Sequence, residues 1–460
     1  MDSNKSRERL GSRLGFILLS AGCAIGVGNV WKFPYMVGQY GGAAFVLIYI
    51  FFLAALGIPV MTTEFALGRA ARKSPVKLYQ ELEPKGSKWH LHGYAAMIGN
   101  YILMMFYTTV SGWMIQYFVA TASGKFVGLD SAGVDSYFVS MLSKPWTMIF
   151  FMGLVVVFGF AICSVGLQKG IEKVTKWMML ALLILILVLA VNSIVADKSG
   201  EGIKFYLIPD FARIQEAGIA NVLVAAMSQA FFTLSIGIGN MAIFGSYIDK
   251  ERSLMGEAVN VAALDTFVAF ASGLIIFPAC FAYGVNPDAG PPLIFQTLPN
   301  IFNNLPAGRF FGALFFLFLT FAAFSTVLTV FENIIACCCD LFNISRRKAC
   351  VINAFVIFTL SIPCVLGFNV LSGFQPFGED SSVLDLEDFI VSNILLPIGS
   401  LVFVVFAVNK FGWGWKKFKD EANAGRGLKV ANWMRIYMTF VLPIIIIVMF
   451  VVGLVNVFAK

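Results

Sequence analysis

Two glycine-rich stretches interrupt apolar segments where membrane-spanning helices are expected. Residues 21–29 read AGCAIGVGN, and residues 235–240 read SIGIGN about two hundred positions later. In hydrocarbon a freed backbone amide or carbonyl has no water to bond, so irregular backbone persists only around a cavity or a ligand. Two broken helices at corresponding places in two halves of a chain are typical of a transporter's binding site. The alternative is that the glycines only let helices pack closely.

The chemistry expected at such a break follows from the backbone. The outer half of a broken helix begins with unpaired amides, whose positive dipole end favours a carboxylate. The inner half ends in unpaired carbonyl oxygens, which suit a desolvated cation. The two stretches therefore predict a site that holds an anionic group and a cation side by side. Asp265 lies in a later apolar segment. A carboxylate there predicts an ion partner, unless neighbouring helices only hydrogen-bond to it.

The composition excludes most other classes of function. The chain has 460 residues, 59% hydrophobic and 13% charged, against about 25% charged in a soluble domain, which predicts an all-α polytopic membrane protein. Its net charge of +7 comes from short polar loops and not from a basic face with interleaved aromatics, so nucleic acid is not an expected partner. The eight cysteines lie in or beside apolar segments and are expected to be reduced packing residues. The apolar segments show no Ser/His, paired-Asp or metal-ligand cluster, which argues against an enzyme.

A spanning helix needs about 20 apolar residues, and by that measure the chain has about eleven spans. They cover residues 15–37, 42–68, 93–122, 145–163, 173–196, 219–247, 257–283, 308–341, 349–369, 389–409 and 434–458. Lys and Arg gather before the first span and in every second loop, whereas the opposite loops are neutral or acidic. One opposite loop is expected to contain Glu379, Asp380, Asp385, Glu387 and Asp388. By the positive-inside rule the N-terminus is cytoplasmic, and an odd number of spans places the C-terminus outside the cell.

The first ten spans divide into two halves of opposite orientation, because each half has five. We expect a single transmembrane transporter domain over residues 1–460, with a cytoplasmic gate segment at 1–14. The first repeat covers 15–196, the inverted second repeat covers 219–409, and an extra helix covers 434–458. The broken first and sixth spans each lead one half, as in secondary transporters built from inverted repeats.

Several motifs make the chain similar to a known family. Residues 22–35 (GCAIGVGNVWKFPY) resemble the first helix of the neurotransmitter:sodium symporter family, residues 64–69 (EFALGR) its second, and residues 228–235 (SQAFFTLS) its sixth. The runs GIEK at 170–173 and PDF at 209–211 fit as well. The match extends over nearly the whole chain. Eleven spans, where twelve are usual, resemble bacterial amino-acid transporters with the leucine-transporter-like fold.

The resemblance implies two sodium sites. The first would use the carbonyl of Ala24, the carboxylate of the substrate, and the side chains of Asn29, Thr233 and Asp265. The second would use the carbonyls of Gly22, Ile25 and Ala322 with the hydroxyls of Ser325 and Thr326. The two hydroxyls have another interpretation, in which they bond back to carbonyls of their own helix.

The same resemblance implies a substrate site and two gates. Substrate contacts would be Ala24, Gly26, Leu103, Tyr107, Phe232, Ser235, Ile238, Thr326 and Val330, with the Tyr107 hydroxyl donated to a substrate carboxylate. The outer gate would be Lys32 with Asp388, and the inner gate would be Arg7 with Asp340, Ser246 and Tyr247. Monoamine transporters of the family carry an aspartate where this chain has Gly26, so a substrate here must bring its own carboxylate. The apolar contact residues offer no charge to pair, which predicts an apolar or aromatic substrate side chain.

Four positions depart from the family's pattern. Lys32 stands where arginine is usual, Leu10 where tryptophan is usual, and Leu180 where many members have a proline that breaks the fifth helix. Ala269 replaces a serine of chloride-dependent members. Asp265 lies one helical turn before Ala269 and can supply the negative charge, so transport is expected not to require chloride.

We therefore expect a sodium-coupled symporter that brings a neutral, hydrophobic or aromatic α-amino acid across the plasma or inner membrane by alternating access. Its partners would be the amino acid, two sodium ions and the lipid bilayer. A non-transporting amino-acid sensor on the same scaffold and a proton-coupled transporter are the alternatives. The sequence leaves open the identity of the amino acid, the sodium stoichiometry, proton counter-transport, the oligomeric state and the effect of Leu180.

Overall fold

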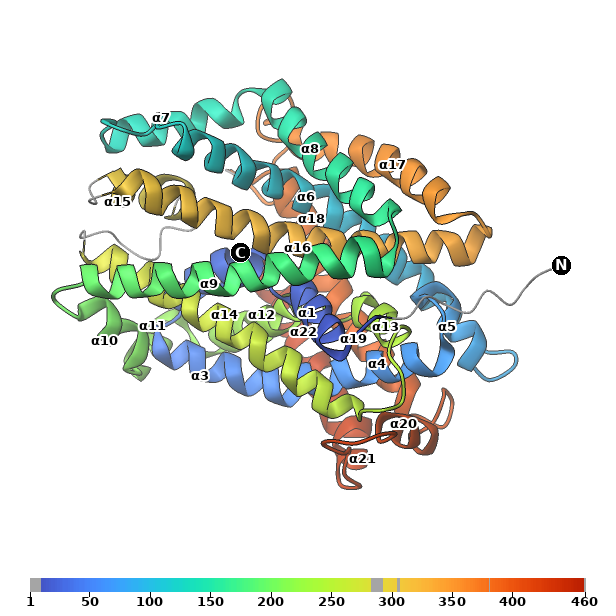
Figure 1. Cartoon of the computed structure of the whole chain (residues 1–460). Helices are drawn as coiled ribbons and strands as arrows, with labels where there is room; N and C mark the ends of the chain where they lie inside the picture. The colour runs from blue at the N-terminus through green and yellow to red at the C-terminus, as the bar shows by residue number, and fades with distance from the viewer. Residues whose placement is uncertain (1–9, 283–292, 304–306, 380, 459–460) are drawn as a thin grey trace.

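The computed structural model is a helical bundle, and it describes residues 10–282, 293–303, 307–379 and 381–458 (Figure 1). Nine helices in these residues are long and apolar enough to cross a membrane. Five of them are α6 (His90–Ala122), α8 (Pro145–Ser164), α14 (Leu254–Ala282), α16 (Gly308–Phe342) and α17 (Arg346–Leu366). The other four contain a π-helical turn: Ala43–Ala71, Leu167–Ala196, Val383–Val408 and Met434–Val455.

The π-helical turns divide those four helices into shorter elements. The first contains α3 (Ala43–Phe52), η2 (Leu53–Gly57) and α4 (Ile58–Ala71), and the second contains η3 (Leu167–Glu172) and α9 (Lys173–Ala196). The third contains α18 (Val383–Phe389), η5 (Ile390–Leu395) and α19 (Leu396–Val408). The fourth consists of α21 (Met434–Ile436), η6 (Tyr437–Val441) and α22 (Leu442–Phe458).

Two further spans are broken in the middle. The first consists of α1 (Arg13–Ala24), followed by η1 (Gly28–Lys32) and α2 (Phe33–Gln39), and its two parts meet at an angle of 55°. The second consists of α12 (Ile219–Thr233) and α13 (Asn240–Gly245). Each of the eleven ranges expected from the sequence overlaps one of these helices or broken pairs, and both predicted breaks are confirmed.

The second break depends on backbone angles that glycine adopts easily. Gly237 and Gly239 have φ angles of +98° and +78°, in the left-handed region. A Cβ atom on Gly237 would lie 2.2 Å from the carbonyl oxygen of Leu396, so the segment also has no room for a side chain there. Ser235 has a φ of +51° in the same turn. This strained segment brings its backbone directly against α19.

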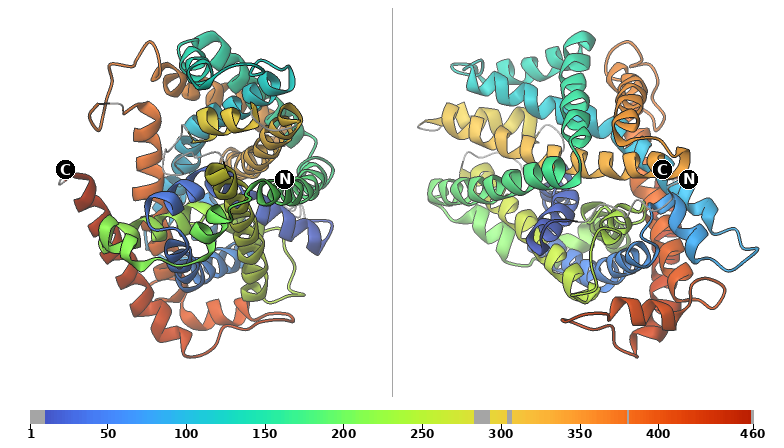
Figure 2. Two further views of the ribbon diagram at one scale, coloured as in Figure 1. Left: turned by 90° about the vertical axis from the view of Figure 1, so that its left-hand side faces the viewer. Right: turned by 45° about the vertical axis from the view of Figure 1, so that its right-hand side comes forward.

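Short helices gather at the two ends of the bundle. In Figure 1 one end carries α7 (Ser131–Leu142), α10 (Glu201–Leu207), α11 (Phe211–Ala217) and α15 (Leu298–Asn303), which follows η4 (Leu293–Thr297). The other end carries α5 (Pro75–Leu82) and α20 (Trp415–Ala422). The helices α6 and α16 form the centre, since 72% of the residues in the most apolar stretch of each helix are buried. Figure 2 shows the last helix, α22, along the edge of the bundle.

The tenth span begins earlier than the sequence indicated. We expected it from residue 389 and placed Asp385, Glu387 and Asp388 in a loop, but α18 begins at Val383 and carries all three. Ser382 and Asp385 form a capping box at its start, and acidic residues favour a helix N-terminus. Counting apolar residues alone therefore missed the first turns of this helix.

The fifth span has no proline and no unwound segment in its middle. Leu180 lies within α9, which runs as a continuous α-helix from Lys173 to Ala196. The irregular part of this span is the π-helical turn η3 at its start, which follows Gly166 with a φ of +116°. The departure at Leu180 thus coincides with an intact helix.

A buried arginine ties the end of α4 to segments from the other half of the chain. Arg69 is 1% exposed and its Nε lies 2.7 Å from Oε1 of Glu421 in α20. Its other nitrogens donate to the backbone carbonyls of Asp249, Arg252 and Glu421. Lys250 adds a second ion pair to Glu421 at 2.8 Å. Glu421 is therefore the point where three segments of this end meet.

Candidate substrate and ion site

A small cavity lies between the two breaks, bounded by the central helices. Its lining residues are Cys23, Ala24, Gly26, Gly28, Leu103, Tyr107, Phe232, Thr233, Ser235, Ile238, Thr326, Val391 and Leu396. The cavity measures about 20 Å³, roughly the space needed for one water molecule. A ligand the size of an amino acid therefore requires surrounding side chains to move outward.

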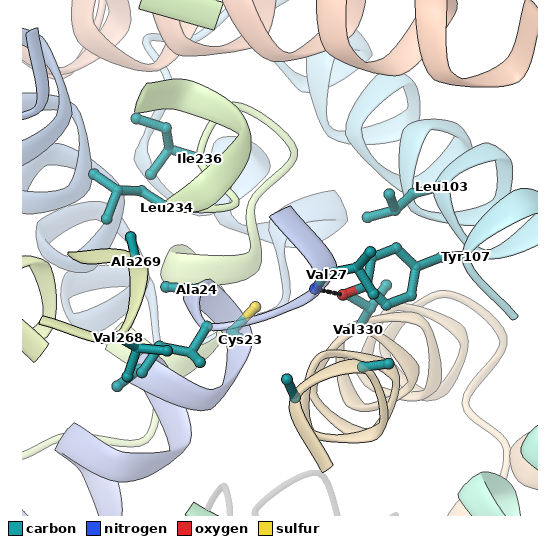
Figure 3. Close-up of a cluster of buried hydrophobic side chains, with 14 of the residues drawn as sticks. Cys23, Ala24, Val27, Leu103, Tyr107, Leu234, Ile236, Val268, Ala269 and Val330 are labelled. Carbon is teal, nitrogen blue, oxygen red and sulfur yellow. Dashed lines mark hydrogen bonds between the residues drawn. The ribbon is translucent and has the colours of Figure 1, made fainter. Parts of the chain in front are cut away.

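Eight of the nine substrate contacts expected from the sequence line this cavity. Val330 is buried on α16 but does not line it, and Figure 3 shows it beside Tyr107. Val391 and Leu396 of the tenth span line the cavity and were missed. The part of their span from Ile390 to Val408 has no charged residue, so no charge periodicity in the sequence indicated which residues point inward.

The amides at the first break already have partners. The hydroxyl of Tyr107 accepts a 3.0 Å hydrogen bond from the amide of Val27, drawn as a dashed line in Figure 3. The amide of Gly26 donates to Oδ1 of Asn29 at 3.0 Å. A Cβ atom on Gly26 would lie 2.3 Å from the Tyr107 hydroxyl and 2.6 Å from Oγ1 of Thr326. Only a residue without a side chain leaves this part of the cavity clear.

Asp265 lies fully buried between the two broken helices. Its carboxylate accepts hydrogen bonds from Nδ2 of Asn29 at 2.8 Å, from Thr233 Oγ1 at 3.1 Å, and from the Tyr49 hydroxyl at 3.4 Å. Asn29, Thr233 and Asp265 are the side chains expected at the first sodium site, and the structure brings them together. Hydrogen bonds from neighbouring helices, the alternative interpretation of Asp265, are also present.

A second group of oxygen atoms lies where α16 passes the end of α1. Thr326 Oγ1 is 3.3 Å from the carbonyl oxygen of Gly22 and 3.4 Å from that of Ile25. Ser325 Oγ is 3.4 Å from the same Ile25 oxygen and also bonds back to Ala322 at 2.9 Å. These are the five oxygens expected at the second sodium site. Back-bonding thus accounts for part of the role of Ser325, whereas Thr326 reaches across to the other helix.

Two polar groups that the sequence analysis gave no role hold the second break in place. Glu64 on α4 is fully buried and accepts hydrogen bonds from the amides of Gly237 at 2.5 Å and Ala242 at 3.4 Å. Asn100 on α6 donates to the carbonyl of Ile238 at 2.8 Å. A carboxylate inside an apolar run is a signal that could have identified Glu64.

Lys32 and Asp388 form an ion pair on one side of the cavity, at an N–O distance of 3.0 Å. Lys32 also lies 4.4 Å above the centre of the Phe232 ring. A larger cavity of about 320 Å³ lies beside this pair, and Tyr107 and Phe232 line both cavities. These two rings therefore separate the small cavity from the larger one.

At the opposite end, three of the four residues expected at the inner gate lie among the described residues. Arg7 lies outside the described residues, and Asp340 accepts a 2.7 Å hydrogen bond from the amide of Ser74. The Ser246 hydroxyl donates to Ile243 in its own helix. Tyr247 donates a hydrogen bond to Glu332 at 2.6 Å.

Glu332 and its partner Arg346 were not identified from the sequence. Glu332 is fully buried on α16, and Arg346 at the start of α17 binds it through both terminal nitrogens. Arg346 also donates to the carbonyl of Cys163 at 2.7 Å. Glu332 is an acidic residue in an apolar helix, so the same signal as for Glu64 was available.

Comparison with known proteins gives consistent matches over the whole chain. The sequence model of the sodium:neurotransmitter symporter family matches residues 7–127 and 138–460. An uncharacterised sodium-dependent transporter of Bacillus subtilis is 34% identical over 445 residues, which cover 95% of this chain and 96% of that protein. An uncharacterised sodium-dependent transporter of Haemophilus influenzae is 33% identical, and the match covers 98% of this chain and 99% of that protein. The crystal structure of MhsT in complex with L-phenylalanine superposes with a TM-score of 0.87. Its sequence is 35% identical, and the match covers 97% of this chain and 100% of the MhsT chain.

Proposed function

Because the chain belongs to the sodium:neurotransmitter symporter family, we propose that it carries a neutral, hydrophobic or aromatic α-amino acid together with sodium ions by alternating access. The family and the sodium-dependent relatives make it a multi-pass membrane transporter that uses sodium, and not an enzyme. The amino-acid substrate, the number of sodium ions and the residues that bind them are the content of the proposal.

The observation that carries the proposal is the apolar wall of the cavity beside the two breaks. Leu103, Phe232 and Ile238 bring no charge to it, and neither do Val391 and Leu396. A charged substrate side chain buried there would lack a partner, which costs several kcal/mol. An amino acid with an apolar or aromatic side chain fits this wall. L-phenylalanine, the ligand in the MhsT structure, is of that kind.

The charged end of the substrate would lie at the first break. Its carboxylate would receive the Tyr107 hydroxyl and a backbone amide of the broken helix, in place of the present bond between Tyr107 and Val27. The first sodium ion would lie between that carboxylate and Asp265, with Asn29, Thr233 and the carbonyl of Ala24. This arrangement requires Asn29 Oδ1 to leave the amide of Gly26. Amines without a carboxylate would leave the sodium ion one ligand short.

The second sodium ion would lie among the oxygens around Thr326. Two hydroxyls and three carbonyls without a carboxylate suit a hard monovalent cation. Unwound carbonyls and half-helix ends coordinate sodium in other transporters of this architecture. Chloride would not be required, since Asp265 lies one turn before Ala269 on α14.

The loop charges support a definite orientation of the chain in the cell membrane. The N-terminus would be cytoplasmic, as the loop charges indicate, and the C-terminus would be outside. Residues 15–196 and 219–409 would form the two inverted repeats within one transporter domain, with 434–458 as the extra helix. Lys32 with Asp388 would be the outer gate, and Arg7 with Asp340, Ser246 and Tyr247 would be the inner gate.

The test is a competition screen of the amino acids against sodium-dependent binding to purified protein. Neutral apolar or aromatic amino acids should compete best, and their decarboxylated amines should compete far more weakly. If lysine or glutamate were the tightest competitor, the assignment of the pocket would be wrong. Uptake into proteoliposomes then separates the alternatives, since a sensor binds without transport and a proton-coupled carrier works without sodium.

A further inference from the structure

Glu387 is a carboxyl group that none of the proposed sites uses. It lies on α18 next to Asp388 and is 4% exposed. Within the described part of the chain no N–H or O–H group donates a hydrogen bond to either of its oxygens. A buried carboxylate that receives no N–H or O–H hydrogen bond carries a large desolvation cost, and within membrane spans such groups mark functional positions.

The two other acids of the same helix have the donors that Glu387 lacks. Asp385 accepts the amide and the hydroxyl of Ser382 at 2.8 and 2.7 Å. Asp388 accepts Lys32 at 3.0 Å and the Ser392 hydroxyl at 2.6 Å. Both line the larger cavity, whereas Glu387 does not. The helix thus turns two charged carboxylates toward the cavity and packs the third one into protein.

The titratable groups around Glu387 are few. The polar group beside it is the thiol of Cys364 on α17, which is fully buried. On α6 the neighbour of that thiol is Thr109, whose hydroxyl donates to the carbonyl of Met105. The turn η5 contains no titratable residue, and Lys32, a cation that lines the larger cavity, is paired with Asp388.

The groups around Glu387 indicate whether a metal ion or a proton binds there. Among the described residues no group of three His, Cys, Asp or Glu side chains that could hold a metal ion is present. One carboxyl beside one thiol offers too few oxygen ligands for a sodium or calcium ion. A proton needs no further ligand, and it removes the charge that burial disfavours.

We propose that Glu387 is a proton-binding site linked to the outer gate. While Lys32 and Asp388 are paired, α18 is packed on α6 and α17, and Glu387 keeps its proton. When the pair separates and α18 moves, water reaches the carboxyl, and the proton passes to that water and leaves a carboxylate. No other bond changes. The inference rests on the gate role proposed for Lys32 and Asp388, but not on the identity of the substrate.

Proton linkage gives the size of the expected pH dependence of gate opening. Where the closed state binds the proton and the open state does not, the ratio of open to closed gate rises about tenfold for each pH unit. Acidic conditions outside would therefore hold the gate closed. This dependence comes from Glu387 and would be separate from any proton exchange at Asp265.

The test is infrared spectroscopy of the full-length protein in lipid nanodiscs, with sodium and without amino acid. A protonated carboxyl has a carbonyl stretch that a carboxylate lacks. We expect such a band at low pH, its loss as pH rises, and its absence from Glu387→Gln. Glu379→Gln makes the same chemical change at an exposed position before the start of α18, and it should leave the band unchanged.

Weakening the gate shows whether the proton is linked to it. Lys32→Gln removes a positive charge, which by electrostatics alone would raise the pH at which the band is lost. Linkage to the gate predicts the opposite, a fall of about 0.5 pH unit or more, or a threefold weaker proton affinity. Ser392→Ala removes a gate hydrogen bond without a change of charge, and it should shift the midpoint in the same direction.

Three results would overturn the proposal. The first is the absence of any band that Glu387→Gln removes, and the second is a band that persists at every pH. The third is a midpoint that rises or stays fixed in Lys32→Gln and Ser392→Ala. None of them depends on transport, so sodium-dependent uptake that persists alongside them leaves the proposed function intact.

Discussion

The hydroxyl of Tyr247 donates a 2.6 Å hydrogen bond to Glu332, a fully buried carboxylate that Arg346 also binds. Tyr247 follows α13, Glu332 belongs to α16, and Arg346 begins α17. One residue expected at the inner gate is therefore held by two residues that the sequence did not single out. This contact joins the second broken span to the central helix on the side away from Lys32.

Removal of this hydrogen bond should favour the state that is open to the inside. A hydrogen bond to a charged group contributes about 1.5–3 kcal/mol, so Tyr247→Phe should weaken the apparent sodium affinity about tenfold in sodium-dependent amino-acid binding. Tyr437→Phe is the matched control, because it makes the same chemical change at a hydroxyl that donates to the carbonyl of Ala55, outside both proposed gates. Equal affinities for Tyr247→Phe and the unmodified protein would show that the contact does not act as a gate.

The proposed second sodium site gives a prediction with a control on the same helix. Ser325→Ala with Thr326→Ala removes two oxygen ligands and should abolish sodium-stimulated binding in a protein that still folds. Thr329→Ala, one turn further along, removes a hydroxyl that bonds back to Ser325 and Thr326, and it should retain sodium dependence. Sodium titrations of amino-acid binding measure both, and an unchanged sodium affinity in the double variant would place the site elsewhere.

The cavity should not tolerate a methyl group at the first break. In Gly26→Ala the new Cβ would approach Tyr107 and Thr326, two residues that the proposal places at the substrate and at sodium. Substrate affinity should fall by about tenfold or more, because both side chains must shift. Gly373→Ala is the control, since no atom lies within 4 Å of the added Cβ. Tight binding by Gly26→Ala would contradict the proposed substrate position.

Transport should not need chloride. In proteoliposomes with gluconate in place of chloride, sodium-driven uptake should persist, because Asp265 would supply a fixed negative charge at the proposed first sodium site. Asp265→Asn with Ala269→Ser should make uptake depend on chloride, whereas Asp265→Asn alone should lose activity in either anion. A large loss of uptake by the unmodified protein in gluconate would refute this assignment.

The fold was largely predictable because its signals are local in the sequence. Runs of apolar residues identify the spans, and the glycines near Gly26 and Gly237 identify the breaks, since a hydrocarbon environment forbids irregular backbone elsewhere. The beginning of α18 was not found by counting apolar residues, because three acids occupy its first turns.

The residues around the cavity were less predictable from physical principles alone. An apolar helix inside a bundle has no polar face, so its sequence gives no direction for Val391 or Leu396. The pairing of Tyr247 with Glu332 joins residues 85 positions apart. Single carboxyl groups in apolar runs, such as Glu64, Glu332 and Glu387, could have been identified from the sequence as candidate functional residues.

The contacts of Arg69 have a consequence for the synthesis of the chain. Its carboxylate partner, Glu421, lies 352 residues further on, so at about 5–20 residues per second the ribosome produces it roughly 20 to 70 seconds later. Until then the guanidinium at the end of α4 cannot be buried as it is in the finished protein. The packing at this end of a helix made early is thus completed by a segment made much later, and a nascent chain that stops before Glu421 leaves Arg69 without its carboxylate partner.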